Sequence, residues 1–165
     1  MKKTGFTLAE VLVTLAIVGV ISALTIPALN QNVANETVGP ALAKAISNLE
    51  SANKRAIAKE NVIRLKDISA DYSVILKDVM NADCTTTSSS GKYTFTCTTA
   101  DGISYISNST SLASGEIEII IDINGKKGED RLNIDQFKVD IYNSGKVEPK
   151  DTALDIQKNG WKYEP

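Results

Sequence analysis

Hydrophobic positions follow three different patterns along the chain. Residues 6–29 form an apolar run whose one charged residue is Glu10, and residues 11–29 carry no charge at all. As an α-helix with a rise of about 1.5 Å per residue, this uncharged stretch is roughly 28 Å long and can span a bilayer. Between residues 38 and 56, apolar residues recur at alternating spacings of four and three. That spacing predicts an amphipathic helix over about residues 40–59, preceded or kinked by Gly39-Pro40.

The period changes from helical to alternating in the C-terminal half. Residues 71–80 keep helical spacing and predict a short second helix, and residues 85–91 are interpreted as a polar, low-complexity loop. Alternating β-branched and aromatic residues then predict four strands, at residues 93–97, 103–106, 116–122 and 137–142. We therefore expect an α+β fold, in which a long N-terminal helix, half membrane-spanning and half amphipathic, packs on an antiparallel sheet of about four strands.

Glu10 is the residue that most needs an explanation. A carboxylate in hydrocarbon is costly, so an acid inside an apolar helix is by default a functional residue with a partner. We expect no partner for it among the neighbouring residues of the precursor. The alternative is an ordinary N-terminal anchor that tolerates an acid near the membrane interface.

The residues before the apolar run resemble a known signal. The run is too long for a conventional secretory signal peptide, and its small-x-small site at Val20-Ile21-Ser22 lies inside the run. Lys2-Lys3-Thr4-Gly5, followed by Phe6-Thr7-Leu8-Ala9-Glu10 and an apolar helix, resembles the class III signal of type IV prepilins and type II secretion pseudopilins. The resemblance implies cleavage after Gly5 by a prepilin peptidase, N-methylation of Phe6 and retention of the apolar helix.

The resemblance also implies a partner for Glu10. Cleavage would create an α-amino group on Phe6, which is cationic at neutral pH and four residues from Glu10 on one helix face. In the resembled family, amine and acid pair between neighbouring subunits; from the residues alone, pairing within one subunit stays open. Gly19 and Pro27 weaken a helix, and the resemblance implies that the helix loosens between them in the fibre. Glycine and proline are also simply frequent in membrane helices.

These observations divide the chain into a leader (residues 1–5), a transmembrane and polymerisation helix (6–29), an amphipathic stalk helix (30–60) and a globular α+β head (61–165). Cys84 and Cys97 flank the polar loop, and in an exported head they predict a disulfide. Two free buried thiols are the alternative.

The loop that begins at Asp122 resembles the start of a calcium loop. Asp122, Asn124 and Asp130 supply oxygen side chains, as in a D-x-[DN]-x-[DN]-G motif. However, Lys126 and Lys127 stand where ligands would be expected, and no closing glutamate follows. An Asn-Gly hairpin turn is the simpler interpretation, with no cofactor required.

Composition narrows the functional classes. The net charge is −2, and removal of Lys2 and Lys3 would leave 16 basic against 20 acidic side chains, so nothing favours nucleic acid as the main partner. The chain has no histidine and no nucleophile-base pair, which argues against an enzyme.

We therefore expect a structural subunit of a type IV pilus-like filament, with a secretion pseudopilin or a minor tip pilin for adhesion or DNA uptake as alternatives. The expected partners are other pilin subunits, a prepilin peptidase and N-methyltransferase, an assembly platform and the bacterial inner membrane. The expected location is the inner membrane before assembly and a periplasmic or extracellular filament afterwards.

Overall fold

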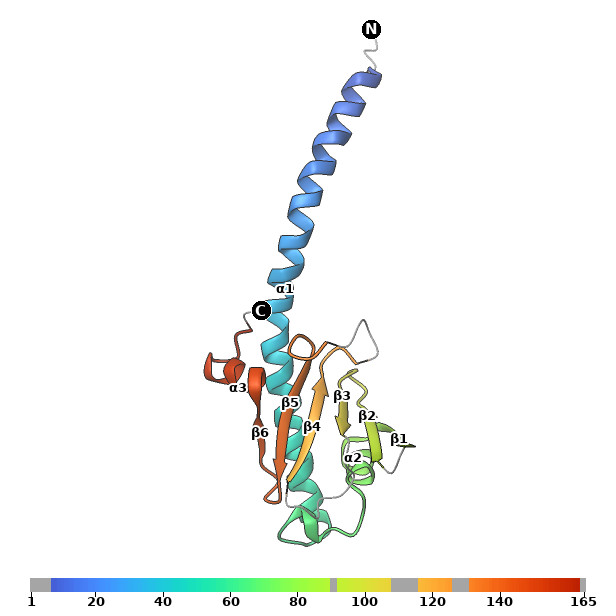
Figure 1. The fold of residues 1–165 in the computed structure, drawn as a ribbon, viewed down its shortest axis with the longest axis vertical. Coiled ribbons are helices and arrows are strands. Elements are labelled where there is room, and N and C mark those ends of the chain that lie inside the picture. Colours follow the sequence, from blue (N-terminus) through green and yellow to red (C-terminus); the bar gives the residue numbers. More distant parts are fainter. Residues whose placement is uncertain (1–6, 90–91, 108–115, 126–130, 164–165) are drawn as a thin grey trace, which may run out of the picture.

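The structure, a computed structural model, describes residues 7–89, 92–107, 116–125 and 131–163. It has a long N-terminal helix whose first half projects beyond a small two-layer head, as Figure 1 shows. The elements are α1 (Leu8–Lys59), a 3-10 turn (Leu65–Asp67), α2 (Tyr72–Met80), β1 (Asp83–Ser89), β2 (Lys92–Thr98), β3 (Ser104–Ser107), β4 (Glu116–Asp122), β5 (Gln136–Tyr142), β6 (Val147–Pro149) and α3 (Asp151–Lys158). The α+β fold with a long N-terminal helix is confirmed.

The apolar run and the amphipathic stripe form one continuous helix. Pro40 lies inside α1, where its side chain is exposed, and α1 continues past it to Lys59. The predicted stripe is confirmed, since its members are all buried: Val38, Leu42, Ala45, Leu49, Ala52 and Ala56. The C-terminal half of α1 therefore supplies one layer of the hydrophobic core, and the sheet supplies the other.

The sheet is an antiparallel meander in the order β1-β2-β3-β4-β5-β6. Strands β4 and β5 pair over seven residues each, and alternate residues of both strands are buried. Buried pairs directly opposite one another are Ile117 and Ile141, Ile119 and Val139, and Ile121 and Phe137. This alternation places an apolar face against α1 and a polar face in solvent, as is usual for antiparallel sheets.

Two strands and one helix were not predicted. The interpretation of residues 85–91 as a loop is wrong for residues 85–89, which belong to β1 and pair with β2 along its whole length. Threonine is β-branched and favours strands, so the signal was present but was taken for low complexity. The third strand residue of β6 is Pro149, and a three-residue strand is too short to show alternation. Helix α3, of eight residues, follows it directly.

The C-terminal tail packs onto the head. The Tyr163 ring meets Phe137 edge-on at 6.2 Å between centroids, and its hydroxyl donates to the Asn133 carbonyl at 3.1 Å. Gly39 of α1 lies against the backbone of Trp161, so closely that a Cβ would sit 1.7 Å from the Trp161 carbonyl oxygen. Glycine inside a helix costs stability, and this close approach of the tail is what requires it here.

A buried hydrogen-bonded side chain joins three parts of the head. Asn53 of α1 is fully buried; its Oδ1 accepts from the Tyr72 hydroxyl at 2.5 Å, and its Nδ2 donates to the Gly145 carbonyl at 3.2 Å. Burial raises the pKa of the Tyr72 phenol, so this hydroxyl stays protonated at physiological pH. Gly145 lies in the β5–β6 turn with φ of 83°, a conformation that suits glycine. Asn53 thus ties α1 to α2 and to the sheet.

Surface charges add weaker links between α1 and the head. Lys44 of α1 contacts Asp101 at 3.0 Å, and Lys59 pairs with Asp78 of α2. The Thr99 hydroxyl and the Lys44 amine lower the pKa of Asp101. Because these groups are solvent-exposed, each pair contributes little to stability.

We predict that Asn53→Ala lowers the free energy of unfolding by about 3 kcal/mol, because the buried Tyr72 hydroxyl and Gly145 carbonyl lose their partner. Denaturant unfolding of the detergent-solubilised chain measures the change. Ser47→Ala, at an exposed position on the same helix, is the matched control and should change stability by less than about 0.5 kcal/mol. Equal effects of the two substitutions would contradict the structural role of Asn53.

The Cys84–Cys97 disulfide joins residues that face each other across β1 and β2, with Cα atoms 4.0 Å apart. The predicted pairing is therefore present in the structure. Because the bond closes a short loop of the unfolded chain, we predict that reduction lowers stability by about 3 kcal/mol. Unfolding midpoints with and without reductant test this, and the double variant Cys84→Ala, Cys97→Ala should lose all sensitivity to reductant. A wild-type midpoint that is the same in both conditions would refute the prediction.

Candidate assembly site in the N-terminal helix

The first half of α1 presents apolar side chains on all sides. The segment Leu8–Thr25 has a mean hydropathy of 2.2 and none of it is buried. Among the described residues, it is the one helical segment whose length and composition would allow it to cross a membrane. An apolar surface of this extent needs a lipid or protein environment rather than water. The described part of the chain supplies no such cover, because the sheet and α2 lie against the other half of α1.

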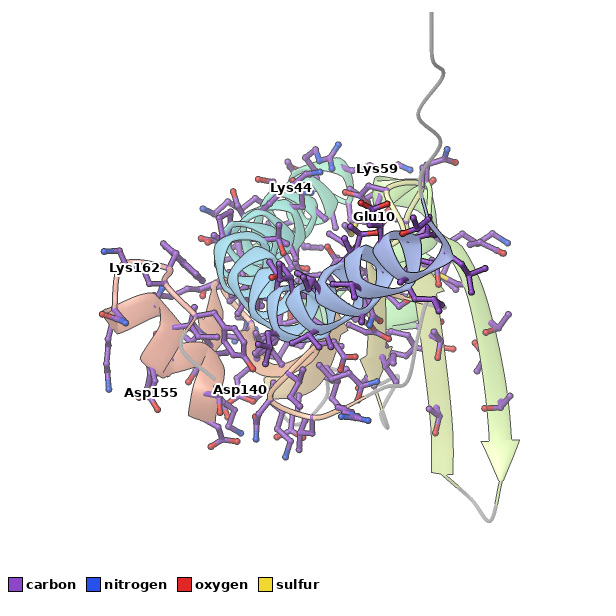
Figure 2. The ribbon with its side chains drawn as sticks, turned by 90° about the horizontal axis from the view of Figure 1, so that it is seen from above. Glu10, Lys44, Lys59, Asp140, Asp155 and Lys162 are labelled. Carbon is purple, nitrogen blue, oxygen red and sulfur yellow. A yellow bond between two sulfur atoms is a disulfide. The ribbon has the colours of Figure 1, made fainter. Side chains whose placement is uncertain are left out.

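Glu10, which Figure 2 labels, lies in the first turn of α1. It closes a capping box with Thr7. The Thr7 backbone N–H and hydroxyl donate to Glu10 Oε2 at 2.8 and 2.9 Å, and the Glu10 N–H donates to the Thr7 hydroxyl at 3.3 Å. The box satisfies two N–H groups that a helix start leaves without partners. The helix dipole also favours a carboxylate at this end.

This geometry corrects one expectation from the sequence. We expected no partner for Glu10 among its neighbours, and Thr7, three residues earlier, is one. The signal was available, because threonine followed three residues later by glutamate before an apolar run is the pattern of a capping box. The partner is an uncharged donor rather than a group of opposite charge. Glu10 therefore has a structural task as well as any role in assembly.

Two threonine hydroxyls in the apolar half are satisfied by the helix itself. The Thr14 hydroxyl donates to the carbonyls of Glu10 and Val11 at 3.0 and 2.9 Å, and the Thr25 hydroxyl donates to Ile21 at 2.7 Å. Such bonds from threonine back to the preceding turn remove the cost of placing a hydroxyl in an apolar environment. They leave Glu10 as the one charged group in Leu8–Thr25.

The structure describes only some of the other predicted site residues in this region. Gly5 and Phe6, predicted for cleavage and methylation, lie outside the described residues. Helix α1 passes through Gly19 and Pro27 without interruption, and a Cβ on Gly19 would meet nothing within 4 Å. The loosening predicted between these two residues concerns the assembled fibre and stays a prediction.

The loop after β4 forms a hydrogen-bonded turn in its described part. Asp122 Oδ1 accepts from the N–H groups of Asn124 and Gly125 at 3.1 and 2.8 Å, and Asn124 Nδ2 donates to Asp135 Oδ2 at 2.9 Å. Asn124 Oδ1 is buried without a hydrogen-bond partner. Asp130 lies outside the described residues, and within the described part no three acidic, histidine or cysteine side chains gather as a metal site would require. The described part therefore has a turn at Asn124-Gly125, but not the expected hairpin, because residues 123–135 separate β4 from β5.

The comparisons with known proteins concern the N-terminal segment. Residues 1–26 match a family model described as the prokaryotic N-terminal methylation motif. No curated protein and no solved structure matches the chain. The matched residues include the basic leader, the Gly5-Phe6 junction, Glu10 and most of the exposed apolar helix. The chain thus carries a class III signal with the prokaryotic N-terminal methylation motif, which supports a precursor of the type IV pilin-like family.

Proposed function

We propose that the protein is a structural subunit of a type IV pilus-like filament, assembled through α1. The observation that carries the proposal is the combination of the methylation motif with a helix half that nothing in the head covers. A prepilin peptidase would cleave after Gly5 and an N-methyltransferase would modify Phe6. The subunit is anchored in the bacterial inner membrane before assembly, and it lies in a periplasmic or extracellular filament afterwards. Its role is structural rather than catalytic.

In the proposed filament, the apolar half of α1 exchanges lipid for the α1 helices of other subunits. Glu10 then sets the register, because an unpaired carboxylate among apolar helices is penalised. The capping box uses Oε2 of Glu10, and Oε1 makes no hydrogen bond with any described residue. Oε1 therefore stays available for the Phe6 amine of a neighbouring subunit. Since that amine arises only on cleavage, removal of the leader makes this contact available.

A type II secretion pseudopilin and a minor tip pilin are the alternatives within the same family. All three would share the signal, the helix and a similar head, so α1 does not distinguish them. A retraction ATPase encoded beside the gene would favour a pilus, and a secretion channel would favour a pseudopilin. High abundance of this chain in sheared filaments would support a major subunit over a minor one.

We predict that Glu10→Ala leaves membrane insertion and cleavage after Gly5 intact and reduces incorporation into fibres at least about tenfold, since a buried charged contact is lost. Quantifying the chain in sheared fibres and in membranes measures the change. Glu10→Gln separates the two tasks of this residue, because glutamine can also close a capping box but carries no charge.

The register proposal requires that Glu10→Gln assemble as poorly as Glu10→Ala. Thr7→Ala is the complementary control: it removes the cap hydroxyl but keeps the charge, so it should assemble better than either Glu10 variant. Assembly of Glu10→Gln at the wild-type level would show that the cap, rather than the charge, matters.

Calcium binding by Asp122, Asn124 and Asp130 is a separate proposal, supported by the buried, unpartnered Asn124 Oδ1. A cation would supply that oxygen with a partner and stabilise the folded head. We expect the thermal midpoint to rise in calcium relative to chelator, and to rise less in Asn124→Ala. Identical wild-type midpoints in calcium and in chelator would remove this proposal.

A further inference from the structure

The two edge strands of the sheet, β6 and β1, differ in length and composition. Strand β6 has three residues, ends at Pro149 and lies between Lys146 and Lys150, and α3 packs against it. Short length, proline and lysine are devices by which proteins prevent pairing at a sheet edge. Strand β1 at the other edge has seven residues, Asp83–Ser89, with no lysine and no proline. Helix α2 contacts β1, as α3 contacts β6, but among the described elements no strand lies beyond β1 in the sheet.

The register shows which backbone groups of β1 face the open edge. The Thr99 N–H donates to the Ile103 carbonyl at 2.9 Å, so odd-numbered residues of β2 bond to β3. Even-numbered residues of β2 therefore bond to β1, and their partners there are Asp83, Thr85, Thr87 and Ser89. The Cα separation of 4.0 Å between Cys84 and Cys97 agrees, because non-hydrogen-bonded pairs are the closer ones. The alternate β1 residues, Cys84, Thr86 and Ser88, consequently direct their N–H and C=O groups outward.

Strand β1 runs across the axis of α1. The β1–β2 hairpin appears foreshortened in Figure 1 and at full length in Figure 2, which looks from above the long axis of the molecule. The hairpin also extends away from α1 and from the rest of the sheet. A two-fold axis parallel to α1 could therefore bring two β1 strands together in antiparallel orientation. The same axis would keep both α1 helices parallel, so both could enter one membrane from the same side.

We propose that β1 pairs with β1 of a second copy of this chain, forming a two-fold dimer of membrane-anchored subunits. The register is centred on Thr86, which faces its own counterpart, so that Thr85 lies opposite Thr87. Cross-strand threonine pairs of this kind are favourable. Asp83, the one charged residue of β1, falls opposite Ser89 at the two ends, so the acids stay apart. The outward groups of Thr86 form the two central hydrogen bonds.

This contact differs in kind from assembly through α1. A two-fold contact uses the same patch on both subunits and closes on itself, whereas a fibre needs a heterologous contact that repeats. One strand pair buries less surface than a standard interface, so it would be weak in solution. Anchoring two copies in one membrane raises their effective concentration. The proposal rests on the membrane anchorage proposed above, but not on fibre formation.

The test places a photoreactive amino acid at position 87 of the full chain, expressed in membranes of a host without a prepilin peptidase. No fibre can form there, so the result is independent of assembly. We expect a crosslinked dimer whose joined peptides both contain β1. Thr86→Lys alone and Thr86→Glu alone should each lower dimer yield at least about fivefold, because like charges would then lie directly opposite each other. Co-expression of the two variants should restore the yield.

Thr86→Val is the matched control, since it keeps the outward N–H and the β-branched shape and should dimerise like wild type. Thr86→Pro removes that N–H without touching the β1–β2 ladder, and should lose the dimer. A non-reducing gel confirms the intramolecular Cys84–Cys97 bond, and therefore a folded hairpin, in each variant. The proposal is overturned if Thr86→Lys dimerises normally, if co-expression restores nothing, or if position 87 crosslinks mainly to another protein or to lipid.

Discussion

Helix α1 is continuous, but its two halves require different environments, one the core of the head and the other an apolar environment outside the head. The arrangement of the head and the proposed function both depend on this constraint. The C-terminal half of α1 buries one apolar stripe against the sheet, where Leu42 and Leu49 have no exposed surface. Its N-terminal half is apolar all round and has no cover within the head. Hydrophobic burial is the main favourable term for both halves, but folding of the head buries only the C-terminal half. The apolar surface of the N-terminal half needs lipid or other chains, which is why the proposed function is one of assembly.

The start of that helix combines two tasks in one carboxylate. Glu10 completes the capping box with Thr7 and so stabilises the first turn of a helix segment that no described residue buries. In the proposed filament, the same group pairs with an amine that exists only after cleavage. To tell the two tasks of Glu10 apart, a substitution must remove its charge and keep its ability to cap the helix.

The head shows how polar groups organise a small domain. The Asn53 side chain connects α1, α2 and the β5–β6 turn, and the disulfide holds the base of the β1–β2 hairpin. The two sheet edges carry opposite chemistry, with lysine and proline near β6 and uncharged hydroxyl residues on β1. An open edge rich in hydroxyl residues is the feature of the head that is most suited to contact with another chain.

The sequence alone determined the periodic elements and the N-terminal motif. Period 3.6 identified α1 and α2, period 2 identified β2 to β5, and the Gly5-Phe6-to-Glu10 pattern identified the signal, because each of these depends on local spacing. Strand β1 was misjudged, since threonine and serine suit both loops and edge strands until a partner strand is known. Only the tertiary structure decided that Gly39 must admit the Trp161 backbone, that Asn53 is buried, and which β1 groups face outward. These features depend on contacts between residues far apart in the chain, and local spacing carries no information about such contacts.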